Sequence, residues 1–173
     1  MITEPLPTTL DVRKAAVRNA TLSGVLVLSK LDRLRPLLAS DDAHIEAHFE
    51  FDRDEENRAV IALSLTAKVE VSCQRCLQAM PVELSGESQL AIVGNDEQAE
   101  QLPGRYEPLI VEGEMCNLWA VVEDELILSL PFVSYHETND CKQLLEDYSK
   151  PGPEEGAGED NPFSVLEQLK PGN

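Results

Sequence analysis

The sequence predicts an α+β fold built mainly on antiparallel β-strands, and three observations lead to this expectation. Apolar and polar residues alternate through much of the segment 43–92, which is the period of strands with one wet face. Helical spacing of apolar residues occurs before residue 40 and again after residue 117. A chain of 173 residues can bury one core without disulfide support. We therefore expect N-terminal helices and a sheet that is either open or closed into a barrel-like form.

The first forty residues favour helices. Asp11 is a suitable N-cap for a helix over 12–18, and the segment 29–32 resembles a weak capping signature before Leu34, Leu37 and Leu38. Between these two helices, residues 22–28 are apolar and too short to assign to a helix or a strand.

Strands are expected at 43–51 and 59–71, joined by the polar segment 52–57 as a hairpin. The alternation continues over 82–92, where Gly86 predicts a bulge or bend.

A helical turn is expected within 94–104, followed by a return to the sheet at 109–111. One helix near 117–130 would begin at Asn117 and end at Pro131. We expect a single α+β domain over 1–149, with a basic helical part at 1–40 and an acidic sheet part at 41–149. In residues 150–173 we expect a flexible acidic linker and a short apolar tail that docks either on a partner or on its own domain.

Charge is unevenly distributed. The formal net charge is -18, but residues 1–40 sum to +3 and residues 41–173 to -21. An acidic body repels nucleic-acid phosphates, favours solubility and attracts a basic partner through long-range electrostatics. A minor RNA contact would fall in the N-terminal third, which carries Arg13, Arg18, Lys30, Arg33 and Arg35.

The cellular compartment follows from absent signals. No basic and apolar leader is recognisable at the N-terminus, and no apolar run approaches the ~18 residues of a membrane span. We expect a cytoplasmic protein that binds no membrane, in which four cysteines are thiols or metal ligands.

Cys73 and Cys76 form a CxxC doublet at the end of a predicted strand, which is the usual half of a tetrahedral zinc site. His136 and Cys141 are the best candidates for the other half, because they follow the predicted helix and offer one imidazole and one thiolate. Two other interpretations remain open: strand-end thiols without metal, and a redox pair, although no helix follows the doublet to lower a thiol pKa.

The other cysteine, histidine and acidic residues that could be reactive are expected to have structural or solvent-exposed roles. Cys116 is expected to be a small buried hydrophobe. His44 and His48 alternate with glutamates on a strand face that is expected to be solvated, and the carboxylates Glu123, Asp124 and Glu125 are expected on an exposed helix face.

No phosphate-binding Gly-rich loop, nucleophile elbow or His-Glu-x-x-His motif is present, and aromatic residues make up 5% of the chain. These observations favour a protein that binds rather than catalyses, with no small-molecule substrate and with at most one structural zinc.

Several strings together resemble the YceD family of large ribosomal RNA subunit accumulation proteins. They span nearly the whole chain, and they comprise Cys73–Cys76, Asp96–Glu100, Leu102–Pro103, Tyr106–Pro108, Val122–Leu128, Leu130–Pro131, His136 with Cys141, and Asn161–Phe163 before Val165–Leu166.

The resemblance implies a cytoplasmic role in synthesis, processing or stability of 23S rRNA and in assembly of the large ribosomal subunit, with no enzymatic activity. Its partners would be a large-subunit ribosomal protein or a 23S rRNA precursor particle. It also implies a second cysteine-containing cluster where His136 and Cys141 stand, and the histidine departs from that pattern. The alternative is an rRNA-processing nuclease that uses the carboxylates at 123–125.

Overall fold

The structure is a computed structural model that describes residues 4–136 and Cys141. The chain divides into two compact units, residues 1–137 and residues 138–173, and the sheet and helices belong to the first. The linker and docking tail expected at 150–173 lie outside the described residues.

A five-stranded sheet forms the body of this unit, in the spatial order β2-β3-β4-β5-β6. Its strands are β2 (Thr21–Leu26), β3 (His44–Arg53), β4 (Ala59–Ser72), β5 (Ala79–Val93) and β6 (Glu107–Ile110). The first four pair antiparallel, and β6 joins β5 in parallel. The predicted α+β class and the antiparallel character are confirmed.

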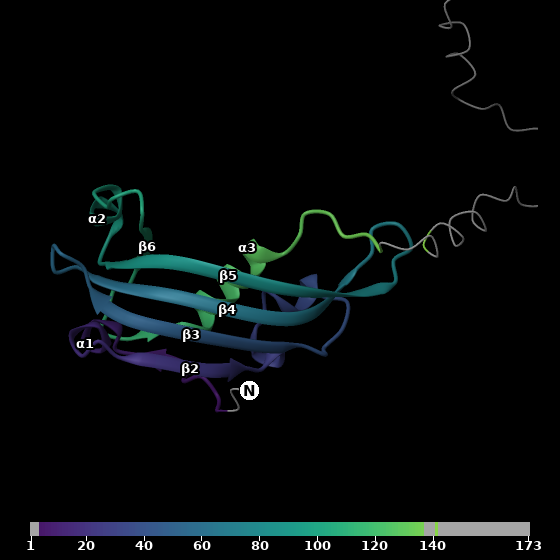
Figure 1. The fold of residues 1–173 in the computed structure, drawn as a ribbon, viewed down its shortest axis with the longest axis horizontal. Coiled ribbons are helices and arrows are strands. Elements are labelled where there is room, and N and C mark those ends of the chain that lie inside the picture. The colour runs from purple at the N-terminus through teal and green to yellow at the C-terminus, as the bar shows by residue number, and fades with distance from the viewer. Residues whose placement is uncertain (1–3, 137–140, 142–173) are drawn as a thin grey trace, which may run out of the picture. The chain divides into compact units, whose positions relative to one another are not determined.

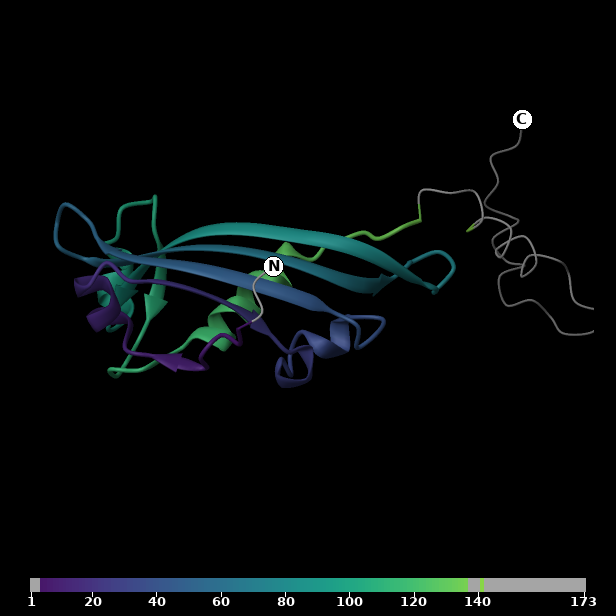
Figure 2. The same cartoon turned by 60° about the horizontal axis from the view of Figure 1, so that its bottom comes forward.

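The sheet is open, so the barrel-like form expected as one possibility is wrong for the described residues. Strands β2 and β6 are its two edges and do not pair with each other. The apolar face is covered by the helix α3 (Leu118–Ser129) and the N-terminal segment, which Figure 2 shows on one side of the sheet. A sheet needs closure only if nothing else buries its apolar face.

Alternation along the strands separates two faces. The inner residues of β4, from Ile61 to Val71, are buried at every second position, while Thr66 and Lys68 on the opposite face are exposed. The bulge expected at Gly86 is absent, because Leu65 pairs with Gly86 in an uninterrupted register. A Cβ at Gly86 would lie 3.2 Å from the Ser129 hydroxyl oxygen, so the glycine serves close packing of α3 on the sheet.

The helix α3 is predicted almost to the residue. Asn117 caps it by accepting hydrogen bonds from the amides of Trp119 and Ala120. The indole of Trp119 donates to the Leu6 carbonyl at 2.9 Å, which ties the N-terminal segment to the helix. A small second sheet, β1 (Thr9–Leu10) with β7 (Cys116–Asn117), lies at the start of α3.

The N-terminal third is less helical than expected. The helix α1 (Val12–Val17) is capped by Asp11 as predicted, but residues 21–26 form the edge strand β2. In place of the second helix are two short 3-10 helices, Leu28–Lys30 and Arg35–Leu37. Pro36 lacks an amide hydrogen, which prevents a regular helix from passing through this point.

The helical turn expected at 94–104 is α2 (Asp96–Glu100), capped by Asn95. The helices α1 and α2 and the β3–β4 hairpin lie at the same end of the sheet (Figure 1). Within the described residues, none of the helices has the length and apolar character that crossing a membrane requires.

Candidate metal centre and its surroundings

The CxxC doublet lies in a tight loop between β4 and β5. The Cys73 amide donates to the Gln78 carbonyl, and the Leu77 amide donates to the Cys73 carbonyl, both at 2.9 Å. Leu77 has φ 59°, a left-handed conformation that glycine adopts most easily. These contacts bend the chain so that a buried Cys73 and a half-buried Cys76 sit on the same turn.

The segment after α3 is held against this loop. The Gln74 amide donates to the Ser134 carbonyl at 2.9 Å, and the Gln74 side chain donates to the Phe132 carbonyl at 3.2 Å. The guanidinium of Arg75 lies over the Tyr135 ring, 4.3 Å from its centroid. Sequence reasoning did not find this scaffold, because carbonyl acceptors leave no signal in residue identity.

His136 is oriented as a ligand would be. Its Nδ1 lies 3.4 Å from the Cys76 sulfur, and its Nε2 lies 3.3 Å from the Ala79 carbonyl oxygen. When Nε2 carries the ring proton it donates to Ala79, and the Nδ1 lone pair then points toward the thiol. Histidines that bind metals are commonly fixed in this way by a backbone carbonyl on the second nitrogen.

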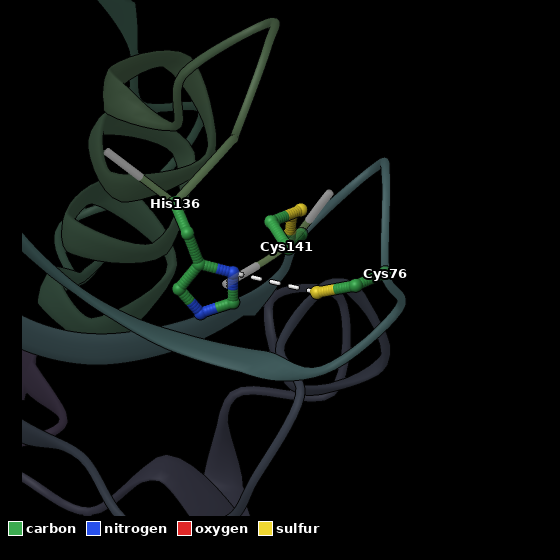
Figure 3. A group of neighbouring side chains, drawn as sticks. Cys76, His136 and Cys141 are labelled. Carbon is green, nitrogen blue, oxygen red and sulfur yellow. Dashed lines mark hydrogen bonds between the residues drawn. The ribbon is translucent and has the colours of Figure 1, made fainter. Parts of the chain in front are cut away.

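Cys141 completes a group of four. The potential ligand atoms of Cys73, Cys76, His136 and Cys141 all lie within 4.8 Å of one another, and Figure 3 shows the last three side chains. This group could hold a metal ion. Tetrahedral zinc with about 2.3 Å to sulfur and about 2.0–2.1 Å to nitrogen requires sulfur–nitrogen separations of about 3.6 Å and sulfur–sulfur separations of about 3.8 Å. The 3.4 Å between Cys76 and His136 is close to this requirement.

Cys116 lies outside the group, in the hydrophobic core at the start of α3. Burial raises the pKa of its thiol. The expectation that Cys116 is a small buried hydrophobe is confirmed.

The histidines of β3 pair with glutamates on the same strand. His44 lies 2.8 Å from Glu46, and His48 lies 3.2 Å from Glu50 and 2.6 Å from the Ser23 hydroxyl. None of these residues belongs to a group of three or more potential metal ligands among the described residues. They form part of the polar outer face of the sheet.

The carboxylates of α3 are all engaged by backbone amides or by side chains of other elements. Glu123 is buried, contrary to expectation, and it accepts hydrogen bonds from the amides of Arg33 and Leu34. Asp124 binds the Arg33 guanidinium, and Glu125 accepts from the Ser88 hydroxyl. Glu123 is buried because the loop between β2 and β3 folds over α3, which sequence periodicity does not reveal.

The basic residues of the N-terminal third are mostly engaged. Arg33 pairs with Glu123 and Asp124, Arg35 pairs with Asp41, and the Lys30 ammonium lies over the Trp119 ring. These contacts engage Lys30, Arg33 and Arg35, whereas Arg13 and Arg18, also expected to contact RNA, form no ion pair among the described residues.

Comparison with known proteins gives a consistent assignment. The family model described as large ribosomal RNA subunit accumulation protein YceD matches residues 61–170. A protein of Haemophilus influenzae described by the same words is 34% identical over 168 residues, which cover 95% of this chain and 96% of that relative. No solved structure matches the chain.

Proposed function

The chain belongs to the YceD family, and we propose that it is a non-catalytic factor for the synthesis, processing or stability of 23S rRNA and for assembly of the large ribosomal subunit. It would work in the cytoplasm by binding a basic ribosomal protein or a pre-ribosomal particle. The observation that carries the proposal is an acidic sheet face that no described element covers (Figure 2).

This acidic sheet face is the outer face of β3, β4 and β5. Its carboxylates are Glu46, Glu50, Asp52, Glu70, Glu83 and Glu87, against the single lysine Lys68. A hollow of about 680 Å³ lies on it, lined in part by His44, Glu46, Lys68 and Glu83. Strand alternation places these carboxylates on one face with a net negative charge, which would steer a basic polypeptide toward the sheet.

A nuclease is less well supported. Metal-dependent phosphodiester cleavage needs carboxylates that converge on an ion. The carboxylates at 123–125 instead bind the Arg33 and Leu34 amides, the Arg33 guanidinium and the Ser88 hydroxyl. Their roles are structural.

We also propose that the cluster of Cys73, Cys76, His136 and Cys141 holds a structural zinc ion. Support comes from the donor set and from the His136 ring, which presents Nδ1 to Cys76 while Nε2 faces a carbonyl. Zinc would fasten the loop after β4 to the segment after α3. Purified protein should contain one zinc per chain, and Cys73→Ser should lose it, while Cys116→Ala should retain it. A metal-free parent would reduce the cluster to neighbouring thiols.

The partner proposal is tested by pulling the protein from growing cells and identifying protein and RNA together. Neutralising Glu46, Glu50, Glu83 and Glu87 to glutamine should abolish recovery of a basic large-subunit protein and lower the ratio of 23S to 16S rRNA. Neutralising four exposed glutamates elsewhere, Glu100, Glu107, Glu112 and Glu114, is the matched control. Equal loss in both variants would show that net charge alone matters and would refute a role for this face.

A further inference from the structure

A positively charged hollow lies at the end of the sheet remote from the cysteine cluster. It has a volume of about 440 Å³ and lies between α1, the β3–β4 hairpin and α2. Its polar lining includes Arg13, Arg53, Asn57, Arg58, Gln98 and Gln101. Figure 1 shows these three elements gathered at one end of the sheet.

The charge of this lining is opposite to that of the chain. Acidic residues outnumber basic ones by 32 to 14 overall, yet the hollow is lined by three arginines and one carboxylate, Glu56. The arginines come from separate elements, α1, the end of β3 and the hairpin. Their grouping therefore arises from the fold and cannot be seen as a basic run in the sequence.

Two of the arginines keep their charge available. Within residues 4–136, neither Arg13 nor Arg53 forms an ion pair: Arg13 donates weakly to the Val111 carbonyl at 3.5 Å, and Arg53 donates to the Asn57 side chain at 2.6 Å. Arg58 is held in place by Asp54 and Glu56. Its Nη2 is shielded from solvent and has no hydrogen-bond partner among the described residues.

We propose that this arginine hollow binds phosphates of an RNA strand, a contact that rests on the proposed role in 23S rRNA accumulation and specifies it. Guanidinium groups bind phosphate oxygens through two parallel hydrogen bonds, and the side-chain amides of Asn57, Gln98 and Gln101 add neutral donors. The ligand would be recognised mainly by its backbone, because the lining residues of the hollow include no aromatic ring on which bases could stack.

The negative charge of the rest of the chain confines RNA binding to the arginine hollow. An acidic surface repels RNA phosphates within about one Debye length, about 8 Å in physiological salt, and beyond that distance the repulsion is largely screened. Close contact elsewhere on the body is therefore disfavoured, which restricts the strand to the place where arginines face it. The acidic sheet face and the arginine hollow would then receive different components of the same particle, a basic protein and an RNA strand.

The test uses the full chain and a fluorescein-labelled single-stranded RNA of twelve nucleotides. Arg53→Glu and Arg13→Glu should each weaken binding by about tenfold, the loss expected for one charge-assisted contact. Each should also lower the slope of log affinity against log salt by about 0.7. Lys68→Glu makes the same charge change on an exposed residue of β4 far from the hollow, and it should change the affinity less than twofold.

Amide signals of the ¹⁵N-labelled protein give a second readout. Titration with the RNA and with inorganic phosphate should shift residues 13, 53, 57, 98 and 101. The inference would be overturned if the shifts were confined to another surface, or if Arg53→Glu and Lys68→Glu weakened RNA binding equally. It would also be overturned if the protein bound inorganic phosphate but not the RNA. The proposed function would survive any of these results if the basic protein were still recovered through the acidic sheet face.

Discussion

Glu123 is the residue whose replacement should destabilise the fold most clearly. Its carboxylate accepts from the Arg33 amide at 2.8 Å and from the buried Leu34 amide at 3.1 Å. It also pairs with the Arg33 guanidinium at 2.9 Å. Glu123→Ala would leave both amides without an acceptor beneath a loop that buries Leu34 completely.

The size of the effect follows from these partners. A buried donor left unsatisfied costs about 1–3 kcal/mol, and the half-exposed Arg33 side chain adds about 0–1 kcal/mol through its ion pair. Glu123→Ala should therefore lower the free energy of unfolding by about 2–4 kcal/mol. For a unit of this size the corresponding fall in Tm is on the order of 10 °C.

The dependence on pH provides a second check. Burial raises the pKa of Glu123, but the hydrogen bonds from the Leu34 and Arg33 amides outweigh burial and hold the pKa below its ordinary value. A carboxylate with a lowered folded-state pKa stabilises the fold above the unfolded-state pKa, about 4.3, and loses that contribution as the pH falls through the folded-state value. The stability difference between the parent and Glu123→Gln should therefore narrow as the pH falls below about 4.3.

Urea denaturation of the full chain at pH 7 and at lower pH measures both effects, with Asp124→Asn as the control. Asp124 is exposed and pairs only with Arg33 among the described residues, so its replacement should cost less than about 1 kcal/mol. Equal losses for Glu123→Ala and Asp124→Asn would refute the structural role assigned to Glu123.

Two further substitutions test backbone strain and close packing. Leu77→Gly should raise the free energy of unfolding by about 0.5–1 kcal/mol, because Leu77 is 77% exposed and has a left-handed φ. Gln78→Gly has no positive φ to relieve and should lower the free energy of unfolding, so equal losses for the two variants in calorimetry would contradict the strain at Leu77. Gly24→Ala should cost about 1–3 kcal/mol, because a Cβ would lie 2.5 Å from the Leu6 nitrogen, whereas Gly113→Ala meets no atom within 4 Å and should be neutral in the same assay.

The sheet and the long helix could be predicted from sequence because each has a local signal. Strands β3 and β4 show a period of two, and α3 begins at Asn117, whose side chain caps it. The segment 28–38 has no such signal. Its conformation depends on the carboxylate of Glu123, ninety residues away, and a contact at that separation cannot be seen in the local pattern.

The cysteine cluster and the arginine hollow also differ in whether the sequence carries a local signal for them. Cys73 and Cys76 can be recognised from their spacing in the sequence. Their grouping with His136 follows if the segment after α3 returns to the end of β4. Arg13, Arg53 and Arg58 come from three elements and have no common spacing, so only the fold brings them to one hollow. Of the basic residues that the sequence favoured, Arg13 lines this hollow, whereas Arg33 and Arg35 are neutralised by carboxylates that lie near them in space.

The distance between the arginine hollow and the cysteine cluster limits the kind of partner that can contact both. Cys73 follows the last residue of β4 and Arg58 precedes its first, so fourteen strand residues separate them. At about 3.3 Å per residue the sites are about 45 Å apart, which is too far for any small ligand to contact both. A partner that engages the arginine hollow and the loop around Cys73 together must itself extend along the sheet. A single nucleotide or metabolite does not have that length, so the arginine hollow and the cysteine cluster act as separate sites toward any small ligand.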